Sequence, residues 1–244
     1  MKTLTAVALI LSLAIISPVQ AGSVKLIELF TSHGCSSCPP ADLLLGELLE
    51  QDEQLLALEF HVDYWNDLIH GSDGNFVDPY SNVAYTQRQR AYHASSLQGH
   101  PGVYTPQAVI NGQVATVGSD RRSIEQALAQ GTDPVLKITF ETTETTDALR
   151  VVINGDRDQL LKLDNAEVVL ARFLDEATTT ITGGENRHRT LVNHHIVTQL
   201  ESLGRVSAER DMRFDIEVPL PNHGCVVLVQ AAALSPVHAA AECP

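Results

Sequence analysis

Residues 30–49 read FTSHGCSSCPPADLLLGELL, and two cysteines, Cys35 and Cys38, stand two positions apart within this stretch. The preceding apolar run at 24–30 is typical of a buried strand. The adjacent prolines at 39–40 are tolerated in the first turn of a helix, where backbone N–H groups lack partners. We therefore predict a strand, a tight turn and a helix, with Cys35 at or beside the helix N-terminus.

This placement suits redox chemistry. A helix N-terminus stabilises a thiolate through its unpaired N–H groups and its macrodipole, and the thiolate is the form that attacks a disulfide. Cys35 is expected to face out of the turn. Cys38 lies within one helical turn of it, close enough to close a disulfide and release a substrate bound to Cys35. The spacing predicts an attacking and a resolving thiol.

Three other interpretations compete. A structural zinc site needs a second matched pair of ligands, whereas Cys225 and Cys243 lie far along the chain and far apart. A purely structural disulfide closes so small a ring that it contributes little stability. Copper(I) is a further alternative, with His33 assisting the two thiolates. The redox pair is favoured because Cys-x-x-Cys near an α/β unit is typical of redox proteins.

The N-terminus predicts export. Lys2 precedes an uncharged run over 4–16, and small residues follow at 17–21. This pattern is typical of a signal peptide over 1–21, and the run is too short to span a bilayer. We expect a periplasmic or secreted protein with no membrane span after cleavage, in a compartment where disulfides persist.

The net charge of the chain limits the classes of partner that it is expected to bind. The 244 residues include 30 acidic and 16 basic side chains, for a formal net charge of −14. This acidity disfavours nucleic acid as a partner. The predicted partners are protein or small-molecule thiols and disulfides, with a membrane electron donor or acceptor as a further candidate. No organic cofactor or metal is expected, since a redox-active Cys35–Cys38 disulfide carries the electrons itself.

The first half of the chain predicts an α/β unit. Apolar residues at 55–62 form a second strand candidate, and 81–97 has a helical pattern. The pair Asn111-Gly112 is a strong hairpin signal within 103–117. A capped helix follows over 119–128. The predicted order is β-α-β-α-β-β-α.

Beyond Pro134 the apolar period changes to two, which predicts an antiparallel, sandwich-like, β-rich domain. We place the boundary near 132–134, dividing the chain into 22–133 and 134–244. The strand candidates are 136–140, 149–153, 168–173, 191–197, 212–220 and 225–230.

The strand, the Cys-Ser-Ser-Cys turn and the sequence Tyr104-Thr105-Pro106 before a hairpin resemble a thioredoxin fold. The resemblance implies a thioredoxin-like domain over 22–133, with Cys35 attacking and Cys38 resolving. It also implies that Pro106 is cis, that Thr105 offers its backbone to an extended substrate, and that Pro106 keeps metal from the thiols. The Ser-Ser spacer between the cysteines differs from the Gly-Pro spacer of thioredoxin, so the resemblance does not imply a value for the redox potential.

More narrowly, the chain resembles the exported bacterial DUF1223 family of unknown function. The resemblance covers about Glu28 to His195, and it implies the fold rather than an activity. The motifs that carry it are ELFTSHGCSSCPPADLLLGEL, FHVDYW, TQRQRAY, VYTPQAVINGQ, VGSDR and GGENRHRTLVNHH.

Several residues are candidates for supporting roles. His33 either lowers the thiol pKa as an imidazolium or is a turn residue in water. Glu28 either accepts the Cys38 proton or ends a strand at the surface. Asp63, Tyr64 and Trp65 either line a substrate groove at a strand end or, for the tryptophan, close the core.

Two features of the second half remain. We expect an ordered loop in which Glu185, Asn186 and Arg187 bind backbone or the first domain. The adjacent residues His194 and His195 should face opposite sides of a strand, which makes them poor co-ligands of one metal. Cys225 and Cys243 are predicted to form a structural disulfide. The favoured function is an exported thiol–disulfide oxidoreductase, and the alternative is a non-enzymatic copper carrier or partner-binding module.

Overall fold

The computed structural model describes residues 24–244, apart from 69–75, 96, 132, 146 and 210–211. The expected signal peptide, 1–21, lies outside the described residues. Within the described ranges no helix has the length and apolar character needed to cross a membrane.

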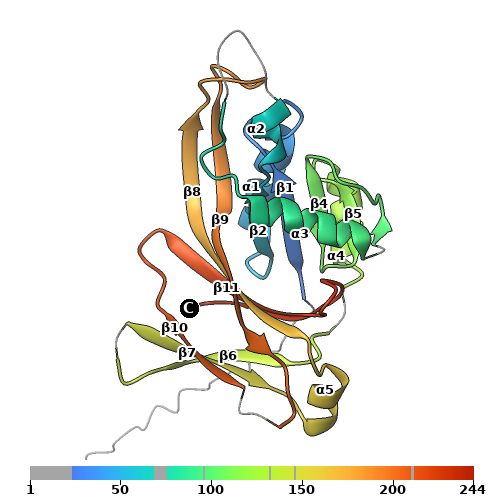
Figure 1. Ribbon diagram of the computed structural model, residues 1–244, viewed down its shortest axis with the longest axis vertical. Helices are drawn as coiled ribbons and strands as arrows, with labels where there is room; N and C mark the ends of the chain where they lie inside the picture. The colour runs from blue at the N-terminus through green and yellow to red at the C-terminus, as the bar shows by residue number, and fades with distance from the viewer. Residues whose placement is uncertain (1–23, 69–75, 96, 132, 146, 210–211) are drawn as a thin grey trace, which may run out of the picture.

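The molecule is a mixed α/β structure built on one large sheet of nine strands (Figure 1). The strand order is β12-β11-β8-β9-β2-β1-β4-β5-β3. The strands from the first half of the chain are β1 (Leu26–Thr31), β2 (Leu56–His61), β3 (Gln98–Gly99), β4 (Gln107–Ile110) and β5 (Val114–Val117). The helices of this half are α1 (Pro39–Gln51), α2 (Tyr64–Leu68), α3 (Val83–Ala94) and α4 (Arg121–Leu128).

Strand β1 lies at the centre of the first half. It pairs in parallel with β2 and antiparallel with β4. Its side chains alternate between faces: Ile27 and Leu29 pack with α1 and α4, whereas Leu26 and Phe30 pack on the side of α3. Strand β4 returns into β5 through the predicted turn, where Asn111 and Gly112 have positive φ angles of 51° and 65°.

The second half joins the same sheet rather than forming a separate one. Strands β8 (Glu167–Thr180) and β9 (Thr190–Arg205) make a long hairpin, and β9 pairs in parallel with β2 at Ile196 and Glu59. Helix α1 packs on β9 so closely that a Cβ atom at Gly46 would lie 2.6 Å from the His194 ring. The expected boundary at 132–134 is thus spanned by one sheet.

The sandwich-like expectation holds for only part of the second half. Strands β6 (Lys137–Thr142), β7 (Ala148–Asn154) and β10 (Arg213–Glu217) form a second sheet in the order β10-β7-β6. Its inner face packs on β8 and β11 (His223–Gln230). Strands β8 and β11 bury both faces, because their alternate residues enter the α3 side of the core.

Four elements of the structure were not predicted from the sequence. They are α2, which lies in a segment expected to be a loop, the two-residue strand β3, α5 (Arg157–Lys162) and β12 (Val237–Glu242). Strand β12 pairs with β11 at the sheet edge, and the Cys225–Cys243 disulfide joins β11 to the end of β12.

Candidate functional site

Cys35 and Cys38 form a disulfide between the end of β1 and the start of α1. Cys38 is the N-cap residue of α1, and its carbonyl oxygen accepts hydrogen bonds from the N–H groups of Ala41 and Asp42. The hydroxyl oxygen of Ser37 lies 3.3 Å from the sulfur of Cys35. The disulfide therefore lies at the helix N-terminus, where a thiolate would meet the positive end of the macrodipole.

A loop from the second half covers this disulfide. We call residues 181–189, the tip of the β8–β9 hairpin, the cap loop. The side-chain amide of Asn186 donates to the carbonyl oxygens of His33 and Cys35, at 2.9 and 2.8 Å, and the Ser36 N–H donates to Glu185 at 3.0 Å. The prediction that Glu185 and Asn186 bind backbone of the first half is confirmed.

The solvent exposure of Cys35 differs from the expectation. Both sulfur-bearing residues, Cys35 and Cys38, have an exposed fraction of 0%. The expectation that Cys35 faces out of the turn is therefore wrong for this conformation. The sequence could not show the cover, because it comes from residues about 150 positions later.

The cap loop is anchored at its base. Ile181 and Leu191 pack with Phe76 in a small apolar cluster, and a Cβ atom at Gly183 would lie 3.0 Å from the Cβ of Phe76. Arg189 donates to the side-chain oxygen of Asn186 at 2.9 Å. These contacts hold the Asn186 amide toward the cysteine turn.

Pro106 and its neighbours lie on the other side of the first turn of α1. The Thr105–Pro106 peptide bond is cis. A Cβ atom at Gly118 would lie 3.0 Å from Pro106 and 3.2 Å from Ala41, so this proline is close to the residues that follow Cys38. The indole N–H of Trp65 donates to the hydroxyl of Thr105 at 2.7 Å. The structure thus brings Trp65, Thr105 and Pro106 together.

Glu28 is turned toward α3 rather than toward the surface. Its carboxylate accepts two hydrogen bonds from Arg88, including Nη2 to Oε1 at 3.0 Å, and one from the Tyr92 hydroxyl. Gln230 of β11 accepts from the same guanidinium at 2.9 Å. Although burial alone lowers the pKa of Arg88, the charges of Glu28 and Tyr92 raise it above its usual value. Glu28 therefore belongs to a buried ion pair.

Asp42 is a candidate that the sequence did not single out. It lies one helical turn after Cys38, is 2% exposed, and accepts a hydrogen bond from the Thr31 hydroxyl at 2.7 Å. Burial and the nearby Glu59 raise the pKa of Asp42 well above its usual value. Its position four residues after Cys38 was the only available signal. A buried carboxyl group with a raised pKa, one helical turn after Cys38, is a candidate for proton transfer at the disulfide.

A buried polar cluster lies beneath the cysteine turn. His33, expected either near the thiols or in water, is 0% exposed, and its ring nitrogens face Asn193 (Nε2, 2.9 Å) and Asp78 (Nδ1, 3.6 Å). Burial and the neighbouring His61 lower the pKa of His33. These contacts direct the ring toward Asn193 and Asp78, which does not favour a copper(I) site with the two cysteines.

The pKa of His61 shifts in the opposite direction to that of His33. Burial alone lowers the pKa of His61, but the carboxylates of Asp78 and Glu59 raise it to about 10. The Nδ1 atom of His61 lies 2.8 Å from Asp78, and Nε2 lies 3.3 Å from Glu59. The cluster combines two imidazoles with two carboxylates, all from the first half of the chain.

Asp63, one of the residues expected to line a groove, binds Thr86 of α3 through its backbone N–H at 3.1 Å, which ties the strand end to that helix. A pocket of about 400 Å³ lies between α1 and β9. Its lining consists of Pro39, Pro40, Asp42, Leu43, Arg189, Thr190, Leu191, Val192 and His194. Most of this lining is apolar, and Pro39 directly follows Cys38.

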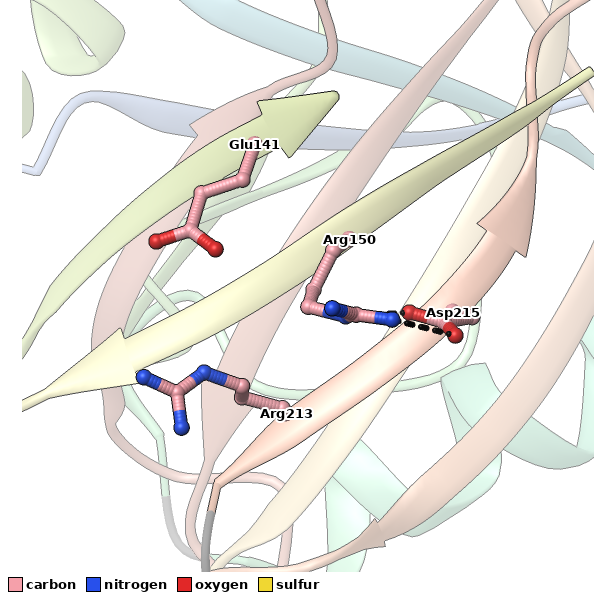
Figure 2. A pocket seen from close by; sticks show the side chains of 4 residues that line it. All are labelled: Glu141, Arg150, Arg213 and Asp215. Carbon is pink, nitrogen blue, oxygen red and sulfur yellow. Dashed lines mark hydrogen bonds and ion pairs between the residues drawn. The ribbon is translucent and has the colours of Figure 1, made fainter. Parts of the chain in front are cut away.

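A second pocket, of about 600 Å³, has a different character. Figure 2 shows its four charged side chains, Glu141, Arg150, Arg213 and Asp215, on the outer face of the three-stranded sheet. Arg150 binds Asp215 through two hydrogen bonds of 2.7 and 2.9 Å. Solvent screens an exposed pair of this kind, so it contributes little to stability. The pocket lies at the opposite end of the molecule from the cap loop (Figure 1).

The family profile of DUF1223, described as a protein of unknown function, matches residues 26–230. The chain belongs to the DUF1223 family. This DUF1223 protein is similar to the crystal structure of protein AGR_C_4864 from Agrobacterium tumefaciens, with 27% identity and a TM-score of 0.68 over 91% of this chain and 94% of that one. It also shares a fold with HBP35 of Porphyromonas gingivalis, at 13% identity and a TM-score of 0.54, over 90% of this chain and 74% of that one. A comparison with curated proteins finds no match.

Proposed function

We propose that this protein is an exported thiol–disulfide oxidoreductase in which Cys35 attacks and Cys38 resolves. The observation that carries the proposal is the Cys35–Cys38 disulfide at the N-terminus of α1. A disulfide placed there is readily reduced, because the helix stabilises the thiolate that forms. Its substrates are protein or small-molecule disulfides and thiols in the periplasm or outside the cell.

The chemistry balances without an organic cofactor. The Cys35 thiolate attacks a substrate disulfide, forms a mixed disulfide and expels one substrate thiolate. The Cys38 thiolate then attacks the Cys35 sulfur, closes the Cys35–Cys38 disulfide and expels the second substrate thiolate. The substrate gains two electrons and the cysteine pair loses two. A membrane-bound dithiol donor returns these electrons in the reductase direction, and an acceptor removes them in the oxidase direction.

A thioredoxin-like arrangement of the first half supports this assignment. The strands lie in the order β2-β1-β4-β5, with β1 parallel to β2 and antiparallel to β4, and the cysteine turn follows β1. Pro106 lies close to the first turn of α1. We propose that the backbone of Thr105 pairs with an extended substrate.

The groove between α1 and β9 supports a polypeptide substrate. Leu43 and Val192, on opposite walls, are 63% and 42% exposed. Exposed apolar side chains beside a reactive group are typical of a binding surface. We propose that apolar residues flanking the substrate cysteine bind here.

Access to the sulfurs requires the cap loop to move. We expect Asn186→Ala to increase the rate at which dithiothreitol reduces the Cys35–Cys38 disulfide by about 30-fold, because it removes two hydrogen bonds worth about 1 kcal/mol each from the closed state. The rate is measured by quenching with a maleimide reagent and mass spectrometry. Thr182→Ala, an exposed position in the same loop, is the matched control. An unchanged rate in Asn186→Ala would show that the loop does not limit access.

Asp42 is proposed to take the Cys38 proton during resolution. We expect Asp42→Asn to slow release of the mixed disulfide by about 100-fold, since this is typical of losing a placed acid or base. The same variant is expected to be more stable at pH 7. Because the pKa of Asp42 is raised in the folded state, its contribution to stability is fully present only below the pKa that it has in the unfolded state. This contribution is lost as the pH rises through the pKa of the folded state.

Both effects of Asp42→Asn are measurable on one preparation. Stopped-flow release of a fluorescent substrate thiol gives the rate, and guanidinium denaturation of the oxidised form gives the free energy of unfolding. Glu50→Gln, at an exposed position on the same helix, is the control. Unchanged release combined with raised stability would leave Asp42 without a part in the chemistry.

The proposed function is tested most directly by redox equilibrium. The protein is incubated in glutathione buffers of varied poise, and the oxidised fraction of Cys35 and Cys38 is read by alkylation and mass spectrometry. We expect a single two-electron transition within the range of known disulfide oxidoreductases, about −120 to −270 mV. A disulfide that stays oxidised below about −300 mV would be structural and would overturn the assignment.

A further inference from the structure

Three ligand-type side chains that the exchange chemistry does not use meet beneath the cysteine turn. His33 follows β1, His61 ends β2, and Asp78 precedes α3. Each offers one potential ligand atom, and these atoms lie within 4.8 Å of one another. Their exposed fractions are 0%, 0% and 1%.

The hydrogen bonds of His33 fix which nitrogen carries its proton. Glu59 accepts a hydrogen bond from the side-chain amide of Asn193, so the oxygen of Asn193 faces the Nε2 atom of His33 at 2.9 Å. An oxygen can only accept, and Nε2 must therefore donate. With the proton on Nε2, the lone pair of the imidazole ring lies on Nδ1. That atom is buried, has no hydrogen-bond partner, and faces Asp78 Oδ1 at 3.6 Å.

A lone pair directed at a carboxylate oxygen is repulsive unless a cation lies between them. Asp78 is itself held in place, since its carboxylate accepts from the backbone N–H groups of His33 at 2.7 Å and Tyr80 at 3.0 Å. A cation must balance the charge that faces Nδ1, and either the protonated His61 ring, 2.8 Å from Asp78, or a metal ion in place of its proton can do so. The arrangement is therefore complementary to a positive ion.

His61 also directs its Nδ1 atom toward Asp78, but here Nδ1 has a hydrogen-bond partner and Nε2 has none among the described residues. Its Nδ1 atom lies 2.8 Å from Asp78 Oδ2, and its Nε2 atom faces Glu59 Oε1 at 3.3 Å. Both rings thus direct Nδ1 toward Asp78 and Nε2 toward an acceptor oxygen. In metal sites, a histidine ligand commonly donates its second nitrogen to a carboxylate or carbonyl group, which fixes the tautomer and the ring orientation.

We propose that His33 Nδ1, His61 Nδ1 and the Asp78 carboxylate bind a divalent first-row transition ion such as zinc. Glu59 and Asn193 then orient the two rings by accepting from Nε2. Two imidazoles and one carboxylate suit zinc and its neighbours, whereas magnesium and calcium prefer all-oxygen sites and copper(I) prefers sulfur. On binding, His61 releases the proton that it shares with Asp78.

Such an ion would join three segments that support the cysteine turn. His33 lies two residues before Cys35, so the ion would connect this turn to β2 and to the segment before α3. Because binding favours the folded state, saturation at 100 times the dissociation constant adds about 2.7 kcal/mol to the free energy of unfolding. The site contains no sulfur, so metal binding can be measured with both disulfides closed.

The test uses the mature chain with both disulfides closed, so that thiols cannot bind metal. The protein is incubated with excess zinc sulfate, desalted and analysed for zinc by mass spectrometry. We expect about one zinc ion per chain for the wild type and the control His93→Gln, at an exposed position on α3, and loss of the ion in His33→Gln. Equal zinc in wild type and His33→Gln, or none in the wild type, would overturn the site.

A second measurement does not depend on a variant that folds. Cobalt(II) replaces zinc in sites of this kind and absorbs visible light according to its ligands. The wild type is expected to give a cobalt spectrum of nitrogen and oxygen ligands, without a sulfur charge-transfer band, and an increased melting temperature with zinc. Failure of both cobalt absorption and the thermal shift would reject the proposal, whatever the outcome of the glutathione titration.

Discussion

Cys35→Ser is expected to reduce the turnover of a disulfide substrate by about three orders of magnitude or more, as losses of a nucleophile usually do. A serine hydroxyl does not ionise near neutral pH and cannot form a mixed disulfide. The measurement is the reduction of insulin disulfides by the protein in the presence of dithiothreitol. Retained turnover in Cys35→Ser would reject the assigned nucleophile.

The partner variant gives the opposite result. Cys38→Ser keeps the attacking thiol but removes the resolving one, so the mixed disulfide with a substrate persists. We expect covalent complexes that dissolve on reduction, and mass spectrometry of these complexes names the substrate. The double variant Cys225→Ser/Cys243→Ser is the control, since its disulfide lies on β11 and β12 and not in the cysteine turn. Complexes that persist in Cys35→Ser/Cys38→Ser would arise from other thiols.

Arg88→Met is expected to lower the free energy of unfolding by about 3–5 kcal/mol, the range typical of breaking a buried ion pair. The change leaves the Glu28 carboxylate buried, at 0% exposure, without its cation. Guanidinium denaturation of the oxidised protein provides the measurement. Arg90→Met, at an exposed position on the same helix, is the control and should change stability by less than about 0.5 kcal/mol.

A second substitution separates charge from packing at this pair. In Glu28→Gln/Arg88→Met the uncompensated charge is gone, so we expect recovery of a large part of the loss, with a coupling free energy within about 0.5–3 kcal/mol. Thiol exchange should persist in this double variant, because Glu28 faces α3. A double variant as unstable as Arg88→Met alone would assign the effect to lost packing around the guanidinium.

The local features of the fold were predictable because neighbouring residues determine them. The Asn111-Gly112 turn requires two positive φ angles, and the residue pair supplies them cheaply. Helix α1 begins at Pro39, as two prolines in a first turn require. Strands β6, β7 and β10 were visible through their alternation, whereas β12 (VHAAAE) was not, because alanine has a low strand propensity.

The long-range features were not predictable from one sequence. Arg88 meets Glu28 and Gln230, and Cys35 meets Asn186, across sequence separations of 60 to 151 residues. Periodicity shows that a side chain is buried but does not identify the partner that buries it. The pairing of β9 with β2 is a contact of the same kind, and for this reason the second half was expected to stand apart.

The pairing of β9 with β2 has a consequence for fragments of this chain. Expressing the first 133 residues alone would uncover the outer edge of β2 and deprive the Glu59 carboxylate of the Asn193 amide and the His194 N–H. An exposed strand edge of this kind pairs with other chains, and a buried carboxylate without hydrogen-bond donors destabilises the folded state. Such a fragment should therefore aggregate, and biochemical work on the cysteine pair calls for the intact polypeptide.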